Sequence, residues 1–522
     1  METNRFVENN PIVKTVTQHL AASPQTFQPK IAADDEMYLY QLDESEDRNS
    51  DRALVYYYLL GRSIVDSIRQ IINAHFGSFS QVNSFLDFAC GYGRSTRFLI
   101  QEIPPEKVWV SDIYANAVKF QMETFGVNGI VSTREPEDYP GDKKFDCIYA
   151  GSFFSHMPPR TFTRWLQRLY DLLTPEGLLI FSVLDEAVIP SHVKMLPEGI
   201  VFSTESSESQ YLDRNEYGTT YVTETYIREL IDKVSQSQAS ICRIKKGLSN
   251  YQDLYVITPK AEQDSTEINF NYHPLGYLDV CEIKPDGNLY LEGWAVDFNP
   301  GGQVKTIQMI VNNRLIQQCQ PHIKRPDLVE HFNRTEALYS GWSCEINGNQ
   351  ISPEDILLIR AVNYAGLEWI IETGFVKSLI PQTQWQTHLI SWRTDLQQTQ
   401  VKLQQTQVNF KQSQTQLNQT RHQLEQSQTK LVQTEERLGQ TQAQLLQNEK
   451  QLDFVQAQLG ECETKLSQTE RELGKCQIQL ESNQVLLEQA RNRIQAMESS
   501  KFWKLRSKWF KLKRAMGLSD ND

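Results

Sequence analysis

The spacing of hydrophobic positions changes several times along this chain of 522 residues. Residues 1–50 are mostly polar and become acidic toward the end, which predicts a loose N-terminal arm. Between Leu54 and Phe76, apolar residues recur every three or four positions, as they do on one face of an amphipathic helix. We expect this helix to pack on the sheet formed by the residues after it and to cover a ligand there.

Short apolar runs and amphipathic stretches then alternate up to residue 260. This alternation is typical of an α/β domain in which helices cover both faces of a mostly parallel sheet. We assign 51–260 to this domain and 261–274 to a polar linker. The expected strands include 107–111, 144–150, 178–184, 240–245 and 253–258, and the expected helices are 94–100, 115–125, 161–173 and 223–234.

Residues 275–380 carry short apolar runs separated by turn residues, which predicts a small β-sandwich. The run Gly293-Trp294-Ala295-Val296-Asp297 and the element Arg325-Pro326-Asp327 resemble small sandwich modules attached to bacterial cell-surface glycan enzymes. This resemblance leaves two alternatives open, a non-catalytic spacer and a carbohydrate-binding module. The expected strands are 289–296, 305–311, 342–346, 356–362 and 369–373.

A seven-residue repeat begins at Leu389, with an apolar residue at one core position of sixteen successive repeats. The other core position is mostly Thr or Ser, so the pattern predicts a long but weak coiled coil over 385–498. As one continuous helical rod it would extend about 160 Å. We expect a parallel homo-oligomer through this rod, with a disordered glutamine-rich segment as the alternative.

The last segment, 499–516, changes character because lysines take over the core positions of the repeat. Seven basic residues and no acidic ones occur between 501 and 514, beside a new aromatic face. Such a basic amphipathic helix is typical of segments that lie on an anionic bilayer, and a helix that docks in a partner's groove is the alternative. The candidate membrane residues are Lys501, Phe502, Trp503, Leu505, Lys508, Trp509 and Phe510.

Composition limits the remaining possibilities. A net charge of −13, without a further basic patch, argues against nucleic acid as a partner. The eight cysteines are scattered without the spacing of a zinc site, which predicts no metal and fits a reducing compartment. The N-terminus lacks a signal-peptide core, and the longest apolar run is too short to span a membrane. We therefore expect a cytoplasmic protein that associates peripherally with the inner membrane.

The candidate chemistry lies in residues 84–96, where an apolar run ends near an acid and a small-residue turn leads into a helix. Gly91 and Gly93 let the backbone turn sharply and let a ligand approach it closely. The following helix directs free N–H groups at the same place. A dinucleotide-binding fingerprint would need a third glycine, and that position is Thr96.

This stretch, with Asp87 four positions before the first glycine, resembles the first motif of class I S-adenosylmethionine-dependent methyltransferases. Ala89 replaces the usual glycine, and alanine is small enough that we expect only a minor adjustment of the turn. Residues 145–157 and 173–180 resemble the fourth and fifth motifs of the family. The resemblance implies a Rossmann-like methyltransferase sheet and S-adenosylmethionine as cofactor. The implied cofactor residues are Asp87, Ala89, Gly91, Gly93, Asp112 and Asp138.

The implied acidic residues have different roles. Asp112 closes the second strand, 21 residues after Gly91, where a carboxylate can accept hydrogen bonds from both ribose hydroxyls. A helix N-cap is the alternative for Asp112. The resemblance places Asp138 beside the adenine amine, with a solvated loop acid as the alternative. The resemblance implies that Asp87 orients the turn or the methionine amino group of the cofactor.

The residues that would bind the methyl acceptor are less clearly indicated by the sequence. Methyl transfer depends mainly on alignment of donor and acceptor, but a hydroxyl acceptor also needs a base. His156 lies just after the fourth strand and is the candidate base, although histidine is common there in the family without acting as one. The insertion 190–223 forms either the acceptor pocket or an ordinary surface lid, and its candidate residues are Tyr211, Glu216, Tyr217 and Tyr221.

The order of these parts resembles bacterial methyltransferases that cap or modify O-polysaccharide on lipid carriers. The resemblance implies O-methylation of a sugar of a cell-surface polysaccharide, on a glycan or glycolipid acceptor at the cytoplasmic membrane face. The kinase domain of some of those proteins is absent here, which leaves a phosphate-methyl product in doubt. A scaffold that recruits membrane-associated glycosyltransferases, with a vestigial methyltransferase fold, is the alternative. Intact Gly91, Gly93 and Asp112 favour the enzyme.

Overall fold

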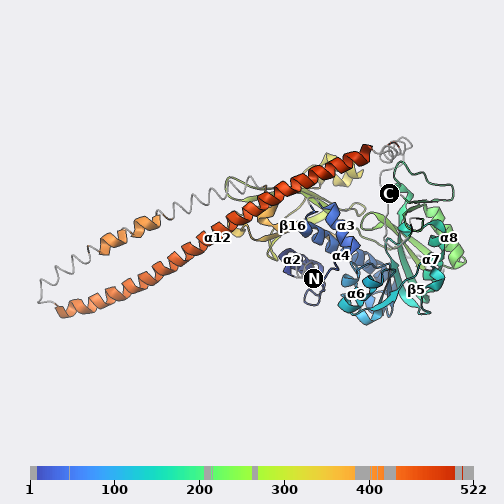
Figure 1. The fold of residues 1–522 in the computed structure, drawn as a ribbon, viewed down its shortest axis with the longest axis horizontal. Coiled ribbons are helices and arrows are strands. Elements are labelled where there is room, and N and C mark those ends of the chain that lie inside the picture. The colour runs from blue at the N-terminus through green and yellow to red at the C-terminus, as the bar shows by residue number, and fades with distance from the viewer. Residues whose placement is uncertain are drawn as a thin grey trace. The chain divides into compact units, whose positions relative to one another are not determined.

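The computed structural model divides the chain into two compact units, Met1–Pro381 with Met497–Asp522, and Gln382–Ala496 (Figure 1). We describe each unit by itself. The described residues are 9–45, 48–204, 213, 215–260, 268–381, 400, 402–407, 409–414, 416, 431–499 and 508.

The N-terminal arm is folded, contrary to the loose segment expected from its polar sequence. It forms α2 (Pro11–Leu20) and α3 (Glu36–Glu44), which precede the long helix α4 (Ser50–Phe76). Asparagine or aspartate side chains cap all three helices by accepting backbone N–H bonds at their first turns. The described part of the arm is therefore held both by caps and by the apolar face that α2 buries. The caps are Asn10, Asp35 and Asn49.

The first domain contains a nine-stranded sheet within the described residues, and its central strands are parallel. The order is β3-β2-β1-β4-β5-β7-β6, and β9 pairs antiparallel with both β5 and β8. This arrangement confirms the predicted α/β, Rossmann-like methyltransferase core. The strands are β1 (Phe85–Phe88), β2 (Val108–Asp112), β3 (Asn128–Val131), β4 (Phe145–Ala150), β5 (Leu173–Asp185), β6 (Ile200–Ser203), β7 (Thr219–Val222), β8 (Ser240–Leu248) and β9 (Gln252–Thr258).

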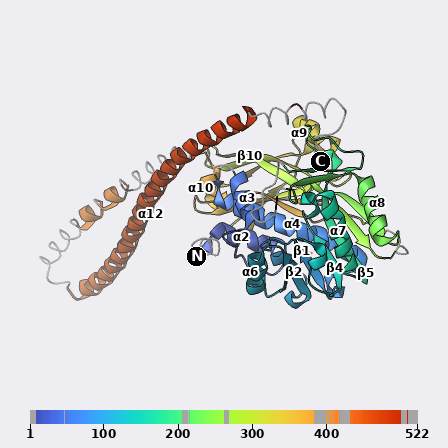
Figure 2. The same cartoon turned by 45° about the vertical axis from the view of Figure 1, so that its right-hand side comes forward.

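Helices cover both faces of this sheet (Figure 1 and Figure 2). Phe85 of β1 joins a core with α4 and α6 (Ala115–Phe125), whereas Leu86 and Phe88 join a second core with α7 (Pro159–Asp171) and α8 (Glu224–Ser235). The strand order reverses between β1 and β4. In open α/β sheets, ligands bind in the crevice at such a switch point, at the carboxyl ends of the strands.

Two antiparallel sheets follow where a β-sandwich is predicted, and the sandwich packing itself stays a prediction. One sheet has the order β10-β11-β14 and the other β13-β12-β15-β16. The sequence pattern missed β10 and β13. The strands are β10 (Leu275–Ile283), β11 (Leu289–Val296), β12 (Val304–Val311), β13 (Arg314–Cys319), β14 (Gly341–Ile346), β15 (Ile356–Asn363) and β16 (Glu368–Phe375).

This two-sheet module (residues 275–380) shares a hydrophobic core with the first domain. Leu358 and Trp369 belong to the same buried cluster as residues of α2 and α4. The described part of the linker, 268–274, is also fixed, because the Gln70 side chain forms two hydrogen bonds with the backbone of Asn271, at 2.7 and 3.0 Å. The two-sheet module is therefore continuous with the first domain rather than tethered loosely to it.

The second unit contains the helix α12 (Leu431–Ser499) and described helical residues between 400 and 416. Gln400 Nε2 donates to Glu463 Oε1 at 2.9 Å. Residues this far apart in sequence would be about 95 Å apart on one straight helix. The described helical residues near Gln400 and Glu463 therefore lie alongside each other within one chain, and the rod expected over 385–498 stays a prediction. The oligomeric coiled coil stays a prediction.

The C-terminal segment is largely outside the described residues. Of the seven candidate membrane residues, only Lys508 is described, and it is exposed. Across the described parts of the chain, no helix combines the length and the apolarity needed to cross a membrane.

Candidate active site

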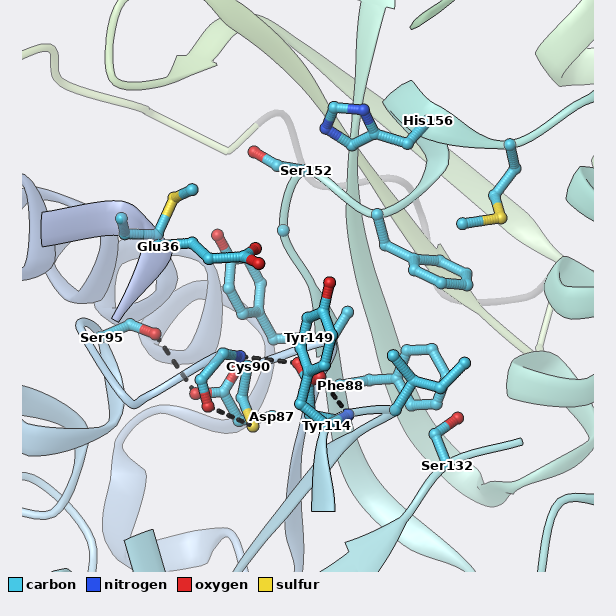
Figure 3. Close-up of a pocket in the computed structure, with 18 of the residues that line it drawn as sticks. Glu36, Asp87, Phe88, Cys90, Ser95, Tyr114, Ser132, Tyr149, Ser152 and His156 are labelled. Carbon is cyan, nitrogen blue, oxygen red and sulfur yellow. Dashed lines mark hydrogen bonds between the residues drawn. The ribbon is translucent and has the colours of Figure 1, made fainter. Parts of the chain in front are cut away.

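A cavity of about 650 Å³ opens at the carboxyl ends of β1, β2 and β4 (Figure 3). Its wall includes Asp87, Ala89, Gly91 and Asp112 from the predicted cofactor motif. It also includes His156, which follows β4, and residues of α3 and of the insertion after β5. The parallel register places Asp87 opposite Tyr149 of β4, so residues far apart in sequence meet at this edge.

The turn after β1 adopts the left-handed backbone that its glycines suggest. Gly91 has φ 54°, and a side chain added there would meet open space. Ala89 has φ 55°, which alanine adopts at a cost of about 1–2 kcal/mol. Ala89 therefore bears backbone strain in this turn.

Gly93 is not among the residues that line the cavity, and its cofactor role stays a prediction. Its φ is 80°, and a side-chain carbon there would approach Gln121 Oε1 and the Phe125 ring within 2.6 Å. This glycine is therefore required by the close contact between the turn and α6.

Asp87 is almost fully buried, at 2% exposure. Its Oδ2 accepts hydrogen bonds from Thr96 Oγ1 at 2.8 Å and from Ser95 Oγ at 3.2 Å. Burial raises the pKa of this carboxyl to about 6. Asp87 thus holds the start of α5 (Thr96–Leu99) and also lines the cavity.

Asp112 joins the ends of β1 and β2. One carboxylate oxygen accepts from Gly91 N at 2.8 Å and the other from Tyr114 N at 3.0 Å. Helix α6 begins after Tyr114 without a side-chain cap, so Asp112 is not its N-cap. The carboxylate remains on the cavity wall, where it can still accept ribose hydroxyls.

The predicted adenine residue, Asp138, is exposed and lies outside the cavity wall. The wall is formed instead by residues 132–135, immediately after β3. Glu135 is the acid of this stretch, and Arg164 Nη1 forms an ion pair with it at 2.6 Å. Of the two acids, Glu135 and not Asp138 lies on the cavity wall, and the contact with adenine stays a prediction.

The folded arm supplies residues that sequence reasoning missed. Three consecutive acids, Asp34, Asp35 and Glu36, accept hydrogen bonds from the hydroxyls of Tyr92, Tyr57 and Tyr114 respectively. The Tyr57–Asp35 bond measures 2.5 Å. Burial raises the pKa values of Asp35 and Glu36. This set of three carboxylate–tyrosine pairs, the acid clasp, holds α3 against the cavity; only the run of three acids could have signalled it.

Arg97, which is fully buried, contacts the acid clasp through the Tyr57 hydroxyl. Its guanidinium donates to the carbonyls of Gln28 and Lys30 at 3.2 and 2.9 Å, and to the Tyr57 hydroxyl at 3.1 Å. Its Nε donates to Gly93 O at 3.1 Å. One side chain thereby ties the arm to the cofactor turn.

On the other side of the cavity, His156 ends a short 3-10 helix, η5 (Phe154–His156). Its Nδ1 lies 2.8 Å from Gly218 O, and its ring stacks on Tyr217 at 4.8 Å. A carbonyl can only accept, so Nδ1 carries the proton and Nε2 carries the lone pair. Burial lowers the pKa of His156, which keeps the ring neutral.

The insertion contributes residues to the cavity wall, and its role as an acceptor pocket or as a surface lid stays a prediction. Glu216 and Tyr217 line the cavity, and Thr161 Oγ1 donates to Glu216 Oε2 at 2.8 Å. Tyr221 does not line it; this residue of β7 is buried against Leu184 and Ile189. Tyr211 lies outside the described residues.

Comparisons with known proteins agree with this geometry. Residues 86–179 match the model of a methyltransferase domain. A malonyl-[acyl-carrier protein] O-methyltransferase of Calditerrivibrio nitroreducens is 20% identical over 234 residues, which cover 43% of this chain and 91% of the relative.

Solved structures include an S-adenosylmethionine-dependent methyltransferase from Clostridium acetobutylicum, at 13% identity and TM-score 0.29, which covers 38% of this chain and 92% of that one. The sugar N-methyltransferase KedS8 from Streptoalloteichus covers 38% of this chain and 88% of that one, at 12% identity and TM-score 0.29. Scores this low do not identify the substrate of this chain.

The chain is a methyltransferase, and its cofactor is S-adenosylmethionine. The residues of the site fit this group, because the open backbone at Gly91 and the two carboxylates Asp87 and Asp112 face one cavity. When bound, the cofactor supplies an activated methyl group. Asp112 and Asp87 would hold its ribose and amino ends, and His156 lies on the wall of the same cavity.

Proposed function

We propose that this methyltransferase O-methylates a sugar hydroxyl of a bacterial cell-surface glycan or glycolipid. The observation that carries the proposal is His156, whose proton is fixed at Nδ1 by Gly218 O. Its Nε2 lone pair can then accept the proton of an acceptor hydroxyl. Stacking on Tyr217 supports the ring in this orientation.

A carboxylate acceptor is the second candidate, because the curated relative is a malonyl-[acyl-carrier protein] O-methyltransferase. A carboxylate is already a nucleophile and needs no base, so the two candidates differ in their dependence on His156.

The test measures transfer of a radiolabelled methyl group by the full-length protein to glycan extracted from a host that lacks the gene. Loss of the base should lower kcat by about 10²–10⁴-fold in His156→Gln and remove the acid limb of the pH profile. His322→Gln, a histidine of the two-sheet module, is the matched control and should behave as wild type. Equal activity of His156→Gln, or transfer only to a malonyl thioester, would contradict the proposal.

We also propose that the protein forms a homo-oligomer through 385–498 and that 499–516 holds it at the anionic cytoplasmic face of the inner membrane. The heptad row and the basic, aromatic composition of the last segment support this arrangement. It would keep the cavity near lipid-linked glycan acceptors. The docking of 499–516 on a membrane-associated glycosyltransferase is the alternative.

A further inference from the structure

Ser152 follows β4 and lines the same cavity as His156, and both are labelled in Figure 3. It has φ 55°, a left-handed conformation that strains a residue other than glycine. Residues held in strained conformations cluster at functional sites, where the surroundings impose the geometry. The sequence motifs and the cofactor contacts described above assign no role to this serine.

A closed network of hydrogen bonds imposes the conformation. Ser152 N donates to Ser182 Oγ at 2.7 Å, and Ser182 Oγ donates to Gln252 Oε1 at 2.6 Å. Gln252 Nε2 then donates to Ser152 Oγ at 3.0 Å. Ser182 is fully buried in β5, and Gln252 begins β9, so both partners sit on strands of the central sheet.

The directions of these bonds determine what Ser152 offers to the cavity. The fully buried Ser182 hydroxyl must give its proton to an acceptor, and Gln252 Oε1 is that acceptor. The amide of Gln252 therefore presents its NH₂ group to Ser152 Oγ. Since Ser152 Oγ already accepts a bond from this amide, its own proton is directed toward the cavity.

His156 complements this donor. Its Nδ1 faces Gly218 O, so the ring offers an acceptor at Nε2. One donor and one acceptor on the same side of a cavity match the two hydrogen-bonding capacities of a neutral hydroxyl. An ammonium group offers only donors and would leave the Ser152 proton without an acceptor.

We propose that the Ser152 hydroxyl, oriented by Ser182 and Gln252, donates a hydrogen bond to the acceptor oxygen and selects a neutral hydroxyl as the methylated group. The inference rests on the proposed function, since it assumes a hydroxyl acceptor. It adds the donor that holds the oxygen while His156 receives its proton. Ser152 is therefore an acceptor-binding residue that also sets specificity.

The test measures acceptor KM and kcat for methyl transfer to glycan extracted from a host that lacks the gene, with the full-length protein at saturating cofactor. Ser152→Ala should raise the acceptor KM by about 3- to 10-fold, the worth of one hydrogen bond, without changing cofactor affinity. Ser152→Gly relieves the strain but also lacks the hydroxyl, so it should show the same defect.

Gln252→Glu tests the direction of the network. A carboxylate accepts from both serines and turns the Ser152 proton away from the cavity, so this variant should match Ser152→Ala although Ser152 is intact. The double variant that combines Ser152→Ala with Gln252→Glu should have the same acceptor KM as either single variant. Ser80→Ala is the matched control and should keep the wild-type acceptor KM, because this exposed serine pairs with Ser78 and lies off the cavity wall.

The outcomes separate the two proposals. Wild-type acceptor KM in both Ser152 variants would overturn the inference alone, as would recovery in Ser152→Gly but not in Ser152→Ala, which would assign the effect to strain. A wild-type acceptor KM in Gln252→Glu would overturn the proposed orientation of the Ser152 hydroxyl. Absence of methyl transfer to glycan by the wild-type protein would overturn the proposed function, and the inference would fall with it.

Discussion

Ala89 occupies a position where the backbone must be left-handed, and its methyl group makes that conformation costly. Replacement by glycine removes the cost in the folded state but adds flexibility to the unfolded chain. We predict that Ala89→Gly raises the free energy of unfolding by about 0.5–1 kcal/mol. Thermal unfolding of the full chain should show a higher Tm. The control, Ala117→Gly within α6, should lower Tm.

The raised pKa of Asp87 predicts that cofactor binding depends on pH. Burial raises its pKa to about 6, so protonation of Asp87 stabilises the ligand-free protein below pH about 4, and this contribution is lost as pH rises through about 6. A cationic cofactor favours the carboxylate and lowers the pKa again. Affinity for S-adenosylmethionine should therefore be about ten-fold weaker at pH 5 than at pH 7. Calorimetry in two buffers should detect proton release near pH 6, and Asp87→Asn should abolish it.

Among the elements, the folded arm is the one that most affects the site. The Tyr57 hydroxyl lies between the buried Arg97 and Asp35, and it is part of the acid clasp. We predict that Tyr57→Phe destabilises the protein by about 1–3 kcal/mol, because the buried Asp35 and Arg97 each lose one hydrogen bond. Hydrogen exchange should become faster in 28–45. Tyr40→Phe, on the exposed side of α3, is the control, and equal exchange in both variants would contradict the role of the clasp.

The elements also show what the sequence can and cannot predict. The bounds of α6 and β11 match the expected ranges, because clear apolar periodicity coincides with turn residues at both ends. Strand β13 was missed because most of its residues are exposed and its apolar residues do not alternate with polar ones. Motif spacing predicted Asp87, Asp112 and His156 on the cavity wall. Glu36 and Gln252 could not be predicted, because only the tertiary fold brings α3 and β9 to that cavity.

At the scale of the whole molecule, the helix α12 leaves part of its heptad row uncovered. Leu487 belongs to this row and is 45% exposed in a single chain. We predict that another copy of the chain covers it. Leu487→Asp should therefore lower the oligomeric state in sedimentation velocity experiments. Leu486→Asp is the matched control, since its leucine is 52% exposed but outside the heptad row. An unchanged oligomer in Leu487→Asp would place the contact elsewhere.

The last prediction concerns the segment 499–516 and joins the oligomer to the membrane. Lysines replace the heptad core where an aromatic face begins, so each copy should bind an anionic bilayer weakly and an oligomer should bind it by avidity. Co-sedimentation with vesicles should require anionic lipid and weaken as salt rises. Replacing Trp503 and Trp509 by Glu should release the protein, while Glu at Leu446 and Phe454, which are exposed and outside both core rows of the repeat, should not. If the first double variant still pelleted as wild type does, a partner's groove would replace the membrane as the target of this helix.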